Sequence, residues 1–368
     1  MNLFAYLEKY GGSSFEELPF GEIDALLLTE LSYLQLEKIS PYYVDGKGRL
    51  PLKSLNLSSL KNLSKRTADP TNLENLILKM AESPRFENMG VGLGLTIQDP
   101  RRVMQYASFT FFLPDGSLFL AFRGTDTTLL GWKENFQLAY RERLASHNQA
   151  LEYAEQVLEW YPDCPVYIGG HSKGGNLASF VTLHLKEKDY QRVIASYNFD
   201  GPDFKKQPAN FEQRKNKIQK YMTQEDVIGA LFNLTENPHI IKATAKLAGG
   251  HNPFSWQVDL PAHILQRVAD RSAASYAGEK AFLEAINQTS EEDIELAADA
   301  LFKIFWSCET VHDLTMNLVP AFLKKDDALS KYTKDEKERI TAFFERLFAA
   351  LLESEAKKFF RKPKKEKR

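Results

Sequence analysis

The sequence predicts an α/β fold built around a mostly parallel sheet with helices on both faces. Strand-like runs alternate with helical patterns across residues 86–260, the order that a parallel sheet with crossover helices requires. Within this region the short run Val166–Ile168 leads through a glycine-rich turn into a helical pattern at 176–185. Asp200 and Asp226 come after two further predicted strands, at the sheet edge where α/β proteins assemble their sites.

Residues 1–80 precede the sheet and have helical patterns without recognisable chemistry. Helical spacing covers 2–10 and 21–36, and residues 50–80 look like another helical pair with a polar break at 67–70. We predict that residues 1–80 form a helical cap or scaffold.

Residues 81–260 form the predicted core of the fold. Its expected elements, in chain order, are strands at 86–94, 104–113 and 118–122, a loop at 127–134 leading into a helix, an amphipathic helix at 148–161, strands at 193–199 and 216–222, and an apolar helix from His239.

The C-terminal part has a different composition. Residues 261–356 have an almost entirely helical pattern and form a predicted extension. The last twelve residues, 357–368, contain eight basic residues and one acid, so we expect a solvated and disordered end. Two phenylalanines inside this basic tail also fit peripheral contact with an anionic membrane.

Composition excludes several classes of protein. A net charge of -2 over 368 residues gives no general attraction to nucleic acid. The two cysteines, Cys164 and Cys308, provide no disulfide framework and suit a reducing compartment. No apolar run approaches the roughly 20 residues that span a bilayer, and the first residues lack the pattern of a signal peptide. We therefore expect a cytoplasmic protein.

The candidate nucleophile is Ser172. It stands at the centre of Gly170-His171-Ser172-Lys173-Gly174, which fits G-x-S-x-G between a predicted strand and a predicted helix. Glycine is required two residues either side of the serine because a Cβ there would strike the neighbouring backbone in so tight a turn. The serine itself is expected to have a strained backbone and an exposed hydroxyl.

A serine hydroxyl needs a base, and only seven histidines are available. In this arrangement the acid and then the histidine follow the serine along the chain. His251, in the loop Gly249–Pro253, is the preferred base because a loop histidine can reach the serine. A solvent-exposed loop histidine is the alternative interpretation. His239 is expected to be structural, and His263 and His312 belong to the helical extension.

Two aspartates compete for the role of the acid. Asp226 is preferred because it lies between the serine and the histidine and is followed by apolar residues that would anchor its loop. Asp200 is the second choice, since an aspartate before glycine often stabilises a turn instead. Glu225 is a weaker third choice.

The oxyanion hole requires two donors. One is expected to be the backbone N–H of Lys173, at the start of the helix after the serine, and the other Thr125, in the loop after the strand 118–122. Arg123 is expected to hold this loop through carboxylate or carbonyl contacts. The Lys173 side chain is expected to line the rim of the site, and selection of an anionic head group is the alternative.

These motifs resemble those of class 3 lipases and, more closely, of the Mbeg-like bacterial proteins of the α/β-hydrolase superfamily. The resemblance rests on the strings Arg123–Asp126, Gly131–Glu134, Gly169–Ala178, Asn198–Pro202 and His251–Gln257. It covers roughly residues 1–260. It implies an α/β-hydrolase fold and hydrolysis of carboxylic esters or lipids.

The sequence therefore predicts a serine hydrolase that cleaves a carboxylic ester, with a lipid or another hydrophobic acyl chain as substrate. Ser172, Asp226 and His251 form the expected catalytic triad, and no cofactor or metal is expected. A thioesterase or a peptidase could use the same triad, and a hydrolase fold used only for binding is the alternative from another class.

Overall fold

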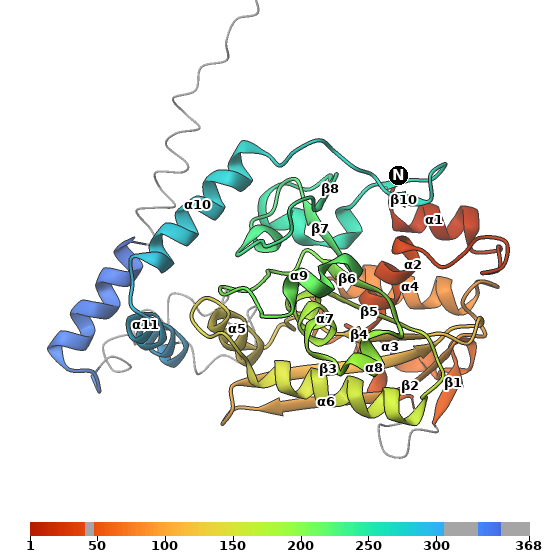
Figure 1. The fold of residues 1–368 in the computed structure, drawn as a ribbon, viewed down its shortest axis with the longest axis horizontal. Coiled ribbons are helices and arrows are strands. Elements are labelled where there is room, and N and C mark those ends of the chain that lie inside the picture. The colour runs from red at the N-terminus through yellow and green to blue at the C-terminus, as the bar shows by residue number, and fades with distance from the viewer. Residues whose placement is uncertain (41–47, 305–329, 347–368) are drawn as a thin grey trace, which may run out of the picture.

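The computed structural model describes residues 1–40, 48–304 and 330–346. Its centre is an eight-stranded sheet in the order β1 to β8, in which β1 to β4 pair antiparallel and β4 to β8 pair parallel (Figure 1). The strands are β1 (Arg49–Pro51), β2 (Gly90–Asp99), β3 (Met104–Phe112), β4 (Leu118–Phe122), β5 (Val166–His171), β6 (Val193–Phe199), β7 (Ile218–Thr223) and β8 (His239–Ile241).

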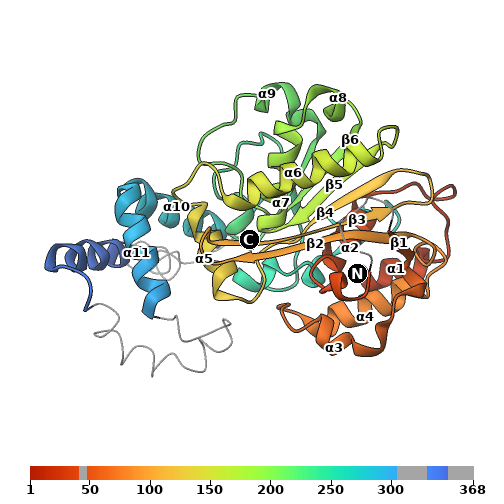
Figure 2. The ribbon, with the colours of Figure 1, turned by 90° about the horizontal axis from the view of Figure 1, so that it is seen from below.

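Helices cover both faces of the sheet, which confirms the predicted fold class. Figure 2 shows the N-terminal helices α1 (Leu3–Tyr10), α2 (Glu22–Leu31), α3 (Leu60–Leu63) and α4 (Pro70–Ala81) on one side of the strands. The other side carries α6 (Ala145–Trp160), α7 (Lys173–His184), α8 (Glu187–Tyr190) and α9 (Phe211–Arg214).

Alternation along β4 separates the two halves of the core. Phe119 and Ala121 pack with the N-terminal helices, whereas Leu118, Leu120 and Phe122 pack with α6 and α7. This is the period of two expected of a strand whose two faces are both buried. The consequence is that α2 and α7 both lie against the strands that lead to Ser172.

The N-terminal segment is joined to the turn that precedes β2 by buried charge. Asp24 of α2 receives two hydrogen bonds from Arg85, at 2.8 and 2.6 Å, and both side chains are almost completely buried. Tyr6 of α1 donates to the same carboxylate at 3.0 Å. The division of the chain at residues 80 and 260 remains a prediction.

Several element predictions are confirmed in position. Strands at 104–113, 118–122, 193–199 and 216–222 correspond to β3, β4, β6 and β7, and the helix at 148–161 corresponds to α6. Others are wrong. The first half of the expected helical pair at 50–80 contains β1, short turns and only the four-residue helix α3, and the strand expected at 86–94 begins only at Gly90.

Two further errors have clear physical reasons. The apolar helix expected from His239 is β8, because a short apolar run can complete a sheet edge as easily as begin a helix. The loop expected at 127–134 is largely α5 (Leu129–Gln137). Thr128 starts this helix by accepting a hydrogen bond from the Gly131 N–H at 3.2 Å.

The extension after residue 260 is partly helical. A small hairpin of β9 (Val258–Asp259) and β10 (Ile264–Leu265) precedes α10 (Ala273–Asn287), α11 (Glu291–Ile304) and helical residues 334–346. These helices lie at one end of the molecule beside α5 (Figure 1), where Lys133 pairs with Asp299 at 2.7 Å. The basic tail at 357–368, for which membrane contact is predicted, lies outside the described residues, as does His312.

Among the described helices, none has the length and apolar composition that a membrane crossing requires.

Candidate active site

Ser172 lies in a strained turn between β5 and α7. Its backbone angles are φ 57° and ψ −130°, which residues other than glycine rarely adopt. Its N–H donates to Phe199 O of β6 at 2.9 Å, and its carbonyl accepts from Gly175 N at 2.9 Å. The turn is therefore tied both to the neighbouring strand and to the first turn of α7.

The two motif glycines are required by space. A Cβ on Gly170 would lie 2.1 Å from the carbonyl of Gly174, and a Cβ on Gly174 would lie 2.1 Å from Phe122 O. Both contacts are with backbone, which cannot move aside. The G-x-S-x-G pattern is thus a steric requirement of the turn in this chain.

Ser172 lines a cavity of about 220 Å³ together with His251, which lies 79 positions further along the chain. The other lining residues come from α2, α4 and α5 and from the loops around them: Glu30, Tyr33, Ala68, Asp69, Leu73, Thr125, Trp132, Asn135, His171, Ile228, Asn252 and Pro253. No hydrogen bond joins Ser172 Oγ to His251 among the described residues. Catalytic hydrogen bonds are often long until substrate binds.

Both candidate acids reach the same nitrogen of His251. Its Nδ1 lies 2.8 Å from Asp200 Oδ2 and 3.1 Å from Asp226 Oδ2. Asp200 directly follows β6 and Asp226 follows β7, so the parallel strands bring them to one edge. The two carboxylates are buried, while the His251 side chain remains 22% exposed. Nε2 is thereby left as the ring nitrogen available to the cavity.

Charge in this cluster is distributed unequally. Burial opposes a charge on His251, but its hydrogen bonds to Asp200 and Asp226 outweigh burial and raise its pKa to about 10. Burial and then the charge of Asp226 raise the pKa of Asp200. Burial also acts against ionised Asp226, but the hydrogen bond to His251 and the N–H groups of Val227 and Ile228 more than compensate, so its pKa is lowered. Asp226 is consequently the more readily ionised acid.

His171, the residue before the serine, holds the His251 loop. Its Nε2 lies 2.9 Å from His251 O, so Nε2 carries the proton, and its Nδ1 accepts from the Tyr33 hydroxyl at 3.1 Å. Burial, followed by the charge of His251, lowers the pKa of His171 well below its usual value. Sequence reasoning missed this function, although a histidine inside the motif was a visible signal.

Of the two expected oxyanion donors, Lys173 directly follows Ser172 and Thr125 lines the same cavity as Ser172. Lys173 is the first residue of α7, where backbone N–H groups have no partner within the helix. Thr125 lines the cavity, and its buried Oγ1 has no hydrogen-bond partner in the described part of the chain. Gly124 allows the loop that carries Thr125 to lie close to His171, because a Cβ on residue 124 would lie 2.5 Å from His171 O.

The side chains around this loop give one confirmation and one correction. Arg123 is buried and donates to Ser32 O and to Leu34 O, which confirms its expected role in holding the loop. The expectation that the Lys173 side chain lines the rim is wrong. It is completely buried and its Nζ bonds Glu134 Oε2 and the backbone carbonyl of Gln105. Lys173 therefore contributes no charge to the cavity.

Asp200, Asp226 and His251 are also the residues best placed to hold a metal ion. One ligand atom from each lies within 4.8 Å of the others. The available histidine atom is Nδ1, and both carboxylates already bond it. The cluster is self-sufficient as a hydrogen-bonded group, and the prediction of no cofactor remains a prediction.

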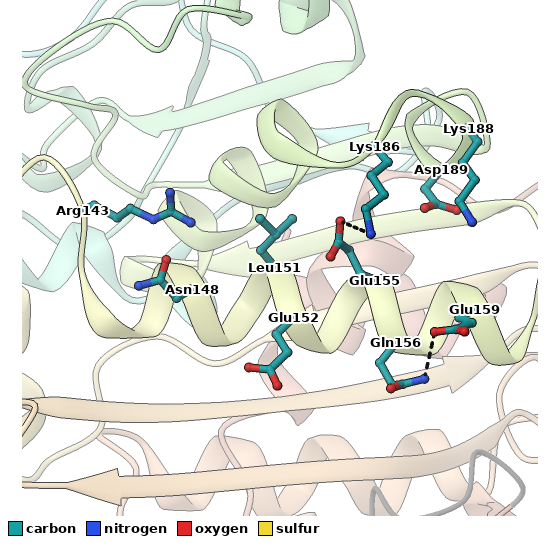
Figure 3. A pocket seen from close by; sticks show the side chains of 10 residues that line it. All are labelled: Arg143, Asn148, Leu151, Glu152, Glu155, Gln156, Glu159, Lys186, Lys188 and Asp189. Carbon is teal, nitrogen blue, oxygen red and sulfur yellow. Dashed lines mark hydrogen bonds and ion pairs between the residues drawn. The ribbon is translucent and has the colours of Figure 1, made fainter.

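A larger cavity of about 470 Å³ lies between α6 and the segment around α8, away from the serine (Figure 3). Its lining is dominated by charged side chains such as Glu152, Glu159 and Lys188, and Lys186 pairs with Glu155 at 3.3 Å. None of the residues around Ser172 contributes to it. Its lining contains no nucleophile with an adjacent base.

A parallel sheet that ends in a strained serine turn, opposite a loop histidine bonded to carboxylates, defines the α/β-hydrolase class. Within this class, the chain belongs to the Mbeg1-like family, whose model matches residues 80–303. Both the predicted fold and the predicted family are thus confirmed.

A solved structure gives a more distant comparison. The crystal structure of Lip2 lipase from Yarrowia lipolytica is 13% identical, with a TM-score of 0.32, and the match covers 69% of this chain and 87% of that chain. No curated protein matches the sequence.

Proposed function

We propose that the protein is a serine hydrolase that cleaves a small carboxylic ester with an apolar acyl part. The observation that carries the proposal is that a strained serine and a histidine with carboxylates on Nδ1 line one cavity. Burial of the serine turn and of both acids fits a preorganised site. A cytoplasmic location is part of the same proposal, and cysteine usage supports it.

In the proposed reaction, Ser172 Oγ attacks the ester carbonyl carbon while His251 Nε2 accepts the hydroxyl proton. Asp226 carries the negative charge that stabilises the resulting imidazolium, and Asp200 also accepts a hydrogen bond from His251 Nδ1. The oxyanion receives hydrogen bonds from the Lys173 N–H and from Thr125. His251 then protonates the leaving alcohol, and a water activated by His251 hydrolyses the acyl-enzyme.

The cavity supports a hydrophobic but short acyl chain. Leu73, Ile228 and Trp132 provide apolar lining. A volume of about 220 Å³ is below the roughly 300–1,000 Å³ of most ligand pockets, which favours small acyl groups over long lipid chains.

A fluorophosphonate probe tests the nucleophile. We expect the full-length protein to be labelled at Ser172, as shown by peptide mass, and the Ser172→Ala variant to lose the label. Absence of label in the folded wild type would contradict the hydrolase proposal and favour a binding scaffold.

A substrate panel tests the reaction class. We expect p-nitrophenyl acetate and butyrate to be cleaved faster than the decanoate, and an acyl thioester and a peptide to be slower than the matched ester. A preference for the thioester or the peptide would replace the ester by that substrate.

A further inference from the structure

The cavity beside Ser172 contains a buried carboxyl that the proposed reaction does not use. Glu30, near the end of α2, is 4% exposed and lines the cavity. Its Oε1 is buried and has no hydrogen-bond partner in the described chain. A buried acceptor without a partner is unfavourable unless something else completes it.

The neighbouring histidine does not complete Glu30. His171 Nδ1 is 3.7 Å from Glu30 Oε1, beyond hydrogen-bonding distance. That nitrogen already accepts the Tyr33 hydroxyl, and the ring proton is on Nε2, directed at His251 O. Burial raises the pKa of Glu30 to about 8, although the charge of His251 acts in the opposite direction. A cation bound beside Glu30 would therefore stabilise its ionised form.

A second acceptor lines the same cavity. The buried Oδ1 of Asn135, from α5, also lacks a hydrogen-bond partner within the described residues. Asp69 adds another carboxylate to the lining, held by hydrogen bonds from Asn72 and Asn252. The residues that line the cavity in the described chain include no lysine or arginine. His251 also lines the cavity, and its positive charge is paired with Asp200 and Asp226. The remaining polar side chains thus favour a ligand that donates hydrogen bonds and carries positive charge.

The exposed Trp132 fits the same ligand. It lines the cavity and is 48% exposed, which places it at the opening. The face of an indole ring attracts cations. A positively charged group would therefore meet a favourable surface on entering and an acceptor at Glu30 inside.

We propose that the substrate is a small ester that carries a protonated amino group near the ester bond, and that the Glu30 carboxylate and Asn135 Oδ1 bind this group. That the ligand is an ester rests on the proposed esterase function, but the amine subsite itself can be tested without catalysis.

Binding is tested on the full-length Ser172→Ala protein by calorimetric titration with n-butylammonium, butan-1-ol and butanoate. We expect n-butylammonium to bind at least tenfold more tightly than the other two. Glu30→Gln, which preserves shape and removes the charge, should reduce this preference to less than threefold. Glu82→Gln removes a charge from an exposed position and should retain the full preference.

Three results would overturn the proposal: equal affinity for the three ligands, tighter binding of the alcohol, or an unchanged preference in Glu30→Gln. If Glu30→Gln fails to fold, Asn135→Ala provides the test, with an expected loss of several-fold in n-butylammonium affinity and none in affinity for the alcohol. No loss there would contradict the subsite.

Catalysis is tested with ethyl esters of alanine, lactic acid and isobutyric acid, which place an ammonium, a hydroxyl or a methyl group at one position. At pH 7, where the amine of the alanine ester is mostly protonated, we expect kcat/KM of the wild type to be 10- to 100-fold higher for the alanine ester than for the isobutyrate, and the ratio to fall in Glu30→Gln. Amine binding without fluorophosphonate labelling would remove the hydrolase proposal alone, whereas labelling without amine preference would remove the subsite alone.

Discussion

Ser172 and Lys173 are adjacent in the turn between β5 and α7, but each belongs to a different group of charged side chains. On the buried side, Lys173 Nζ pairs with Glu134, and both side chains are 0% exposed. On the cavity side, Ser172 shares its cavity with His251, which is bonded to Asp200 and Asp226 and remains 22% exposed. The Lys173–Glu134 pair and the His251 cluster are separate because the chain turns between β5 and α7.

The difference between these groups is whether their unpartnered atoms face the cavity. Glu134 Oε1, like Glu30 Oε1, has no hydrogen-bond partner in the described chain, but Glu134 does not line the cavity. Lys173 Nζ has three acceptors: Glu134 Oε2, Gln105 O and Gln105 Oε1. Glu134 Oε2 also accepts from the Gln105 N–H at 2.9 Å, so the pair ties α5, α7 and β3 together. Within the part of the chain that the structure describes, the cavity side retains a His251 Nε2 without a hydrogen bond and the unpartnered atoms Glu30 Oε1 and Thr125 Oγ1. The Lys173–Glu134 pair holds the turn in place, whereas the His251 side of the turn can bind a ligand.

The largest effect on activity should come from the acid of the cavity-side group. We expect Asp226→Asn to reduce kcat/KM for p-nitrophenyl butyrate by about 100-fold or more, since loss of the triad acid costs up to about 10⁴-fold where no second acid stands by. Asp200→Asn should cost about tenfold, because Asp226 still holds Nδ1. A larger loss in Asp200→Asn would exchange the two roles.

The buried side should respond through stability. Lys173→Met leaves Glu134 without its counter-charge, and breaking a buried pair in this way costs about 3–5 kcal/mol in the free energy of unfolding. Urea unfolding followed by circular dichroism measures this. The double variant Lys173→Met/Glu134→Met removes both charges and should recover most of the loss. Equal stability of Lys173→Met and wild type would contradict the comparison.

The sequence predicted the elements that local signals specify. The turn around Ser172 was predictable because Gly170 and Gly174 are sterically required. The strand β4 was predictable because an apolar run follows a turn at 114–117. The short strand β8 was not predictable, because its three residues, two of them apolar, acquire strand conformation only by pairing with β7. The start of helix α5 was predicted too late because it depends on a single capping threonine.

Contacts across long separations limited prediction of the site. The sequence predicted that Asp200 and Asp226 lie at one sheet edge. Their common contact with His251 Nδ1 depends on the conformation of the His251 loop, which no hydrophobic periodicity predicts. Glu30 was beyond prediction for a similar reason. It belongs to a helix whose other residues are core-like, and only packing of α2 against β5 brings it to the cavity.

The pH dependence should reflect the cavity-side group alone. His251 has its pKa raised to about 10, above the ordinary value of about 6.5, so at pH 7 its ring is protonated and cannot act as base. We expect kcat/KM to rise between pH 7 and 10. In Asp200→Asn, loss of one hydrogen bond lowers the His251 pKa, so the rising limb should move to lower pH. An unchanged profile would contradict this assignment.

The same shift predicts a change in stability. A raised pKa means that the folded protein holds the proton more tightly than the unfolded chain. The contribution of His251 to stability is therefore complete below about pH 6.5 and is lost as the pH rises through about 10. Thermal unfolding of wild type and Asp200→Asn should show a smaller decline in Tm from pH 7 to pH 10 in the variant.

The smallest effect should come from Tyr33, which lines the cavity and whose hydroxyl reaches the His251 loop through His171. Tyr33→Phe keeps the ring and removes the hydroxyl that bonds His171 Nδ1, a loss of about 0.5–1.5 kcal/mol for a neutral hydrogen bond. The His251 loop then loses part of its support, and we expect kcat to fall about three- to tenfold. Tyr10→Phe is the matched control, because its hydroxyl donates to Leu260 O at 2.9 Å, remote from the cavity. Equal losses of kcat in the two variants would mean that Tyr33 supports the fold generally; a loss confined to Tyr33→Phe would show that the cavity-side group depends on the position of the His251 ring.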